Sequence, residues 1–210
     1  MIDLLYFGNP MCSWCWGFSP VLHRLLEAHQ DRINLSVLMG SIGDRGRQPM
    51  NEHDRSYVRQ HWEHVQELTG QPFDFGFFDR ALFTYDTELP SRAVGVVRSV
   101  YPGLSLPFFA HLQERFYAHN EDITALSVLE KAAANFNVEP ADFRRLYALP
   151  AISEGLRQEW QQTASLGVTG YPTLLAVQEG KPQVLSIGYR PYDQIEAAFR
   201  EVAGLARVTA

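Results

Sequence analysis

Residues 2–15 read IDLLYFGNPMCSWC, and this stretch decides the fold of the chain. Its first half is a short apolar run that ends at a glycine-asparagine-proline turn, which is typical of a strand buried on both faces of a sheet. Its second half places Cys12 and Cys15 at the start of an amphipathic helical segment. A second strand, at 33–39, completes a strand–helix–strand unit, which the crossover rule makes parallel and right-handed.

Cys12 and Cys15 are the only cysteines among the 210 residues. A bond between them would close so short a loop that it would restrain the unfolded chain little, so the pair is a poor structural staple. Positions i and i+3 of a helix lie about 5–6 Å apart, a spacing at which a disulfide can form. Cys12 is predicted at the helix N-terminus, where free N–H groups and the dipole favour a thiolate, while Cys15 is more shielded. We therefore predict that Cys12 attacks disulfides and that Cys15 resolves the mixed disulfide.

The rest of the chain changes pattern twice. Helical spacing of apolar residues predicts a series of helices over 54–68, 91–101, 106–118, 124–136, 140–147 and 153–166. Two strands are then expected at 173–178 and 183–187, joined by a turn at 179–182. The chain is expected to end in a helix that begins near Asp193. The predicted fold is α/β, with one domain from residues 1–48 and 163–210 (βαβ plus ββα) and an inserted helical domain over 49–162.

The composition argues against several classes of protein. The chain has 18 Lys and Arg against 24 Asp and Glu, so its net charge of −6 lacks the basic footprint of nucleic-acid binding. The N-terminal sequence lacks the basic and long apolar regions of a secretory signal, and no stretch is apolar enough for a transmembrane helix. We therefore expect a cytoplasmic protein with no nucleic-acid or membrane partner.

A second motif, Gly170-Tyr171-Pro172-Thr173, stands just before the strand at 173–178. Proline at the start of a strand is ordinary, because no ladder donor is needed there. An X–Pro bond can also be cis at a cost of about 0.5–1 kcal/mol. A cis bond before Pro172, placed beside Cys12, would leave the backbone of Tyr171 free to pair with an extended peptide.

These features together resemble the thioredoxin fold, and the helical insertion resembles its DsbA branch. Residues 9–18, NPMCSWCWGF, are similar to the cytoplasmic predicted protein-disulfide isomerase group of DsbA-like proteins, and so is the segment 167–173. Other segments similar to that group are Met39-Gly40, Trp62 with 69–73, Tyr85-Asp86-Thr87-Glu88 and Ser91-Arg92-Ala93. The resemblance covers nearly the whole chain and implies a thioredoxin-like fold with a helical insertion.

The resemblance also implies an activity and a site. The activity is thiol–disulfide exchange, with Cys12 and Cys15 as catalytic residues and Pro172 as the cis-proline. Ser13, Trp14 and Tyr171 are the expected substrate-binding residues. The expected partners are disulfide-containing proteins or peptides, with glutathione as a small-molecule candidate, and no cofactor or metal is expected.

Other candidate residues carry weaker expectations. Many thioredoxin-like enzymes have a buried acid six positions before the nucleophile, and Tyr6 stands there in this chain. The segment 85–88 with Arg92 is expected to cap a helix rather than to contact substrate. His61 and His64 are expected on a solvated helix face rather than at a metal site. A flexible loop near the active site is predicted from glycines that follow the second strand, Gly40, Gly43 and Gly46.

Two other function classes stay open on sequence alone. One is a glutathione-dependent isomerase or transferase of the same fold, which uses a serine and the sulfur of glutathione. The other is a non-enzymatic binder of peptide or zinc, for which His23 and His29 are the nearest additional ligands to the two cysteines. Retention of both cysteines favours a disulfide reductase or isomerase, since a reducing cytoplasm keeps such a pair as the dithiol.

Overall fold

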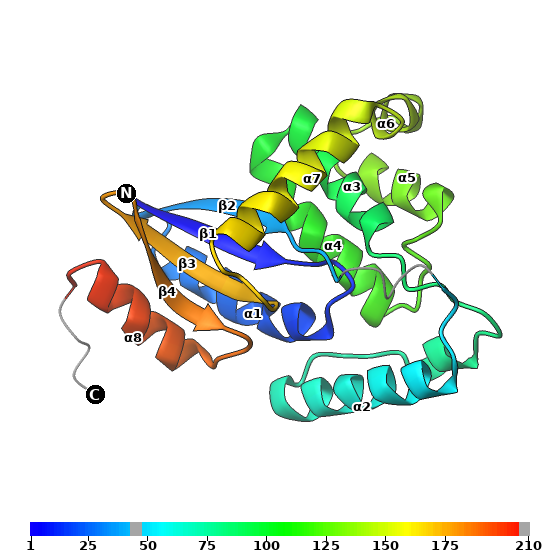
Figure 1. Cartoon of the computed structure of the whole chain (residues 1–210), viewed down its shortest axis with the longest axis horizontal. Coiled ribbons are helices and arrows are strands. Elements are labelled where there is room, and N and C mark those ends of the chain that lie inside the picture. The colour runs from blue at the N-terminus through cyan, green and yellow to red at the C-terminus, as the bar shows by residue number, and fades with distance from the viewer. Residues whose placement is uncertain (43–47, 206–210) are drawn as a thin grey trace.

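The structure is a computed structural model that describes residues 1–42 and 48–205. Its centre is a four-stranded sheet in which β1 pairs in parallel with β2, while β3 runs antiparallel to both β1 and β4. The strand order is β2-β1-β3-β4, with β1 at Ile2–Gly8, β2 at Ile33–Met39, β3 at Thr173–Gln178 and β4 at Lys181–Ile187. The two ends of the chain thus build one sheet, and the fold is α/β and thioredoxin-like as predicted (Figure 1).

Both faces of the sheet are buried. Successive side chains of a strand point to opposite faces, so neighbouring residues of β1 lie in different clusters of the core. Tyr6 is 1% exposed and belongs to the main core. Phe7 packs with Leu38 and Leu175 in a smaller cluster on the other face. The central strand β1 is therefore apolar at consecutive positions, as its sequence predicted.

Helices α1 and α8 lie on the Tyr6 face of the sheet. Helix α1 (Ser13–Ala28) begins directly after Cys12, and its Phe18 ring stacks on Tyr6. Helix α8 (Tyr192–Val202) packs against α1, and Glu196 of α8 pairs with His29 at 2.8 Å. The two cysteines therefore lie at the start of α1, just after the end of β1.

The segment between β2 and β3 is helical. It comprises α2 (Glu52–Thr69), α3 (Glu88–Val100), α4 (Ser105–Tyr117), α5 (Leu126–Ala134), α6 (Pro140–Tyr147) and α7 (Pro150–Ser165), with short 3-10 turns at Phe75–Asp79 and Pro102–Leu104. Helix α4 packs on α1, and α7 packs on β2. In Figure 1, α2 lies apart from α3–α7 and reaches toward the start of α1. Among the described residues, no helix combines the length and apolar character needed to cross a membrane.

The antiparallel hairpin predicted at this end of the chain is confirmed, but its turn is shorter than the predicted 179–182, because β4 already begins at Lys181. The hairpin loop consists of Glu179 and Gly180, both with positive φ, which is the geometry that two-residue hairpins favour. Pro182 lies within β4, opposite Val177. It is tolerated there because β4 is an edge strand with one side free of ladder partners.

Candidate active site

The loop between β1 and α1 is held by Asn9, whose side chain is fully buried. Its amide accepts a hydrogen bond from the backbone N–H of Met11 and donates one to the carbonyl of Gly40, each at 2.8 Å. The backbone N–H of Cys12 donates to the Asn9 carbonyl at 3.0 Å. This loop is therefore tied to the ends of β1 and β2, and it sets Cys12 as the N-cap residue of α1.

Cys12 and Cys15 are both free thiols, with Cys12 half-buried and Cys15 0% exposed. A hydrogen bond from the Cys15 side chain holds the pKa of Cys12 below its ordinary value, helped by the backbone N–H groups of Cys15 and Trp14 against the effect of burial. Burial raises the pKa of Cys15 well above its ordinary value, and the hydrogen bond to Cys12 and the charge of Cys12 raise it further. When the dithiol loses its first proton, Cys12 therefore becomes the thiolate and Cys15 stays protonated.

The Tyr171–Pro172 loop lies beside Cys12. The peptide bond is cis, as predicted, and the Cys12 thiol donates to the Tyr171 carbonyl with a sulfur–oxygen distance of 3.6 Å. The Tyr171 hydroxyl accepts from the backbone N–H of Ser41 at 3.1 Å, and its ring lies where a side chain on residue 40 would be. A Cβ on Gly40 would stand 2.1 Å from that ring, so the close approach requires glycine.

The glycine loop predicted after β2 is described only in part. Gly43 and Gly46 lie outside the described residues. Gly40 follows the end of β2 and is held in place, because its backbone N–H donates to the Gly8 carbonyl at 2.7 Å. Its function in the structure is to make room for Tyr171.

Trp14 packs against α2 and the segment that follows β4. Its indole N–H donates to Nδ1 of His61 at 3.3 Å, and its ring centre lies 5.4 Å from that of His64 and 6.2 Å from that of Tyr189. The solvated face expected for these histidines is confirmed for His64, which is exposed, whereas His61 is half-buried, and both also contact a residue of the cysteine motif. Burial lowers the pKa of His61, and the neighbouring His64 lowers it further, which favours the neutral ring that this hydrogen bond requires. Ser13 is half-buried at the first position of α1.

Sequence reasoning missed a contact from the helical segment to the cysteine loop. The Tyr85 hydroxyl donates to the Met11 carbonyl at 2.8 Å and lies 3.5 Å from the Tyr117 hydroxyl. Burial raises the pKa of both tyrosines, so both phenols stay protonated. Met11, the residue before Cys12, is thereby held by Tyr85 from the segment that precedes α3, and Tyr85 in turn contacts Tyr117 of α4.

The segment 85–88 forms the start of α3, as predicted. Thr87 occupies the N-cap position of α3 without a side-chain capping bond, whereas Asp86 accepts from the backbone N–H of Glu88 at 3.0 Å. Arg92 contacts Tyr147 of α6, donating to its carbonyl at 2.6 Å.

The described residues contain no group of three His, Cys, Asp or Glu side chains that could hold a metal ion. His29, one of the two zinc ligands considered from the sequence, is paired with Glu196. His23, the other, lines a groove with Trp16 and His111.

Comparison with known proteins relates this chain to DSBA-like proteins. The family model for DSBA-like thioredoxin domains matches residues 4–200. A proposed protein disulfide isomerase from Nitrosomonas europaea is 29% identical, with 97% of this chain and 98% of that chain covered and a TM-score of 0.88. The cytosolic disulfide reductase DsbM from Pseudomonas aeruginosa is 25% identical, with 97% and 100% covered and a TM-score of 0.81; a second structure of DsbM contains GSH.

Curated relatives carry a different description. The ClpXP adapter protein SpxH of Halalkalibacterium halodurans is 20% identical over 91% of this chain and 64% of its own length. SpxH of Bacillus subtilis is 20% identical over 92% of this chain and 66% of its own length. The chain therefore spans slightly less than two thirds of each of these relatives.

Proposed function

The chain belongs to the family of DSBA-like thioredoxin domains, and we propose that it is a thiol–disulfide oxidoreductase of the reductase or isomerase type. In this proposal Cys12 is the nucleophile and Cys15 is the resolving thiol. The observation that carries it is the geometry of the pair: Cys12 lies half-buried at the N-cap of α1 with its sulfur 3.6 Å from the Tyr171 carbonyl, and Cys15 is fully buried one turn later. The lowered pKa of Cys12 and the raised pKa of Cys15 agree with these roles. The 25% identity to a cytosolic disulfide reductase supports the same direction of chemistry.

The reaction runs in two exchanges. The Cys12 thiolate attacks one sulfur of the substrate disulfide, so a bond forms between Cys12 and that sulfur while the second sulfur leaves as a thiolate. Cys15 then attacks the Cys12 sulfur, which forms the Cys12–Cys15 disulfide and releases the first substrate sulfur as a thiol carrying the Cys15 proton. The substrate gains two electrons and the dithiol loses two. If another substrate thiolate attacks the mixed disulfide first, the substrate disulfide is exchanged rather than reduced.

An external thiol must restore the dithiol after each reduction, and we assign this part to glutathione. Two molecules of glutathione return the Cys12–Cys15 disulfide to two thiols and leave as oxidised glutathione. The presence of GSH in a structure of DsbM supports the choice. We place the reaction in the cytoplasm, because its reducing conditions keep the resting pair as the dithiol and because DsbM is cytosolic.

The substrate chain is proposed to lie along the loop of residues 171–172. The Tyr171 carbonyl faces the Cys12 sulfur at 3.6 Å, so a disulfide that reaches Cys12 brings its own backbone beside that carbonyl. Extended peptides pair with exposed backbone in this way. Pro172 shapes this loop, while Ser13 and Trp14 border Cys12 on the other side in the sequence and offer a hydroxyl and an aromatic surface.

The test is reduction of a disulfide-linked peptide with glutathione as the source of electrons. We expect turnover by the unaltered protein and a loss of roughly a hundredfold or more in Cys12→Ser, because the attacking thiolate is removed. The exposed Ser165→Ala variant of α7 is the control and should retain full turnover. Unchanged turnover in Cys12→Ser would contradict the proposal.

A further inference from the structure

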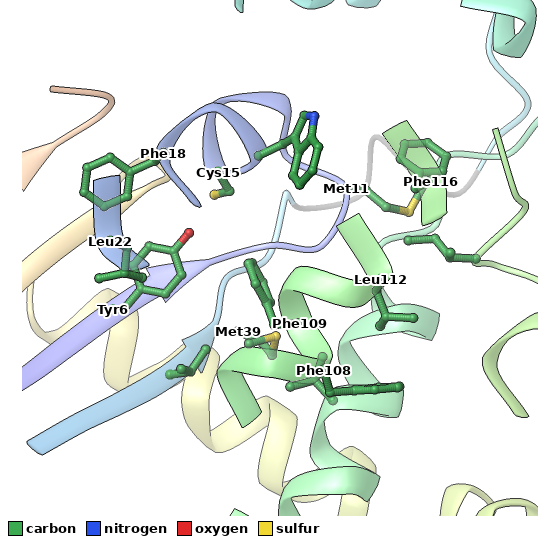
Figure 2. Packing of buried hydrophobic residues seen from close by; sticks show 14 of the residues in the cluster. Tyr6, Met11, Cys15, Phe18, Leu22, Met39, Phe108, Phe109, Leu112 and Phe116 are labelled. Carbon is green, nitrogen blue, oxygen red and sulfur yellow. The ribbon is translucent and has the colours of Figure 1, made fainter. Parts of the chain in front are cut away.

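Tyr6 lies on the central strand directly beneath the dithiol. It is 1% exposed, and its ring packs between Phe18 of α1, stacked with a centroid distance of 6.2 Å, and Phe109 of α4, edge-on at 5.8 Å. Figure 2 shows its hydroxyl directed toward Cys15, which descends from α1 into the same core. An apolar ring would fill this space equally well, so packing alone does not explain the hydroxyl.

The hydroxyl has a partner at the site. Hydrogen bonding between the Tyr6 and Cys15 side chains acts to raise the pKa of Tyr6 and to lower that of Cys15, and the backbone N–H of Asn9 acts to lower the pKa of Cys15 as well. Burial raises the pKa of Tyr6 well above its ordinary value, and negative charge on Cys15 and Cys12 raises it further. The phenol therefore keeps its proton and acts toward a Cys15 thiolate only as a donor.

We propose that Tyr6 is a further catalytic residue, acting on the second exchange: its hydroxyl stabilises the negative charge that the Cys15 sulfur carries once it has given up its proton and is ready to attack the mixed disulfide. This inference rests on the proposed function and assigns a group to its resolving step. A hydrogen bond to an ionised sulfur is stronger than one to a neutral thiol, so the contact strengthens when Cys15 ionises and raises the fraction of Cys15 that is the attacking thiolate. The first exchange does not use it in this way, because the charge there begins on Cys12.

The proton balance of the step follows from the chemistry of a phenol. The Cys12–Cys15 bond forms, the bond between Cys12 and the substrate sulfur breaks, and the Cys15 proton goes to the departing substrate sulfur. Tyr6 neither gains nor loses a proton. A carboxylate at this position could take the proton itself, whereas a protonated phenol cannot, so the departing thiolate must accept it.

The experiment separates the two exchanges in Tyr6→Phe, which removes only the hydroxyl. The reduced protein is mixed with oxidised glutathione and quenched with acid, and mass spectrometry follows formation and decay of the Cys12–glutathione adduct. We expect decay to slow by about 4-fold to 15-fold, because loss of a hydrogen bond to a charged group lowers the thiolate fraction while the more basic thiolate is intrinsically more reactive, with formation changed by less than about threefold. The pH profile of decay should also move to higher pH, which a packing defect would not cause.

A matched variant and an internal ratio control for folding. Tyr147 lies on α6, and its hydroxyl donates to the Leu89 carbonyl at 3.1 Å. Tyr147→Phe removes this hydroxyl and should leave both rates unchanged. A smaller folded fraction lowers both exchanges equally, so the ratio of decay to formation is the decisive quantity. An unchanged ratio in Tyr6→Phe would overturn the inference while leaving the proposed function intact. An unaltered protein that forms neither the adduct nor the Cys12–Cys15 disulfide would overturn both.

Discussion

Replacing Cys15 with alanine should make Cys12 a weaker nucleophile at low pH. The hydrogen bond from Cys15 is the largest influence that holds the pKa of Cys12 down, and alanine removes it while the backbone N–H groups of residues 14 and 15 remain. A hydrogen bond to a charged group contributes about 1.5–3 kcal/mol, which corresponds to roughly a 12-fold to 150-fold smaller thiolate fraction below the pKa. A more basic thiolate is intrinsically more reactive, with a Brønsted coefficient of about 0.4–0.5, so the net loss of rate is about 4-fold to 15-fold. Since Cys12 is only half-buried, water replaces part of the lost bond and favours the lower figure.

The assay is the rate of alkylation by iodoacetamide against pH, with mass spectrometry locating the label. Only the thiolate reacts, and in Cys15→Ala the label has a single cysteine to modify. The midpoint of the profile should rise relative to the unaltered protein. Cys15→Ser keeps a hydroxyl donor in the same place and should show a smaller rise. Superposable profiles for the alanine variant and the unaltered protein would refute the assignment of this hydrogen bond.

Two further predictions concern stability. Gly40→Ala should destabilise the fold by about 1–3 kcal/mol, as overpacking does, because its Cβ would stand 2.1 Å from the Tyr171 ring. Urea unfolding measures this loss of stability. The control is Gly155→Ala in α7, whose Cβ would meet nothing within 4 Å and which should cost no stability. A destabilisation no larger than that of Gly155→Ala would contradict the packing argument. Burial raises the pKa of Glu196, but hydrogen bonds from His29 and neighbouring groups outweigh it and hold that pKa below its ordinary value. The stability that this carboxylate contributes is therefore present above the unfolded pKa of about 4.3 and is lost as pH falls through the lower folded value. Unfolding across pH should show Glu196→Gln less stable than the unaltered protein at neutral pH, with the difference shrinking in acid, and a constant difference would contradict the assignment.

Local signals account for much of what the sequence predicts correctly. The apolar run of β1, the helix start at Cys12 and the pairing of β3 with β4 each depend on residues close together in the chain. The position of Cys12 at the N-terminus of α1 follows from the same local pattern, and so does the burial of Cys15 one turn later. The cis bond before Pro172 was predicted as one of two alternatives, and only the fold shows that it lies beside Cys12.

The contacts that sequence reasoning missed join distant segments. Tyr85 reaches Met11 across 74 positions, and Trp14 reaches His61 across 47. Both depend on how the helical segment docks on the sheet, which no short-range pattern specifies. A histidine on a polar helix face looks solvated in sequence, and it is the docking of α2 beside α1 that brings Trp14 to it. The sequence shows that Tyr6 stands where related enzymes have an acid, but its contact with Cys15 depends on the packing of β1 against α1.

The most direct test of the central claim is to trap the first exchange. Cys15→Ser cannot resolve a mixed disulfide, so after reaction with oxidised glutathione it should carry one glutathione, and peptide mapping by mass spectrometry should place it on Cys12. The result that would contradict the account is a Cys15→Ser protein that stays unmodified under conditions in which a free thiol of ordinary pKa reacts.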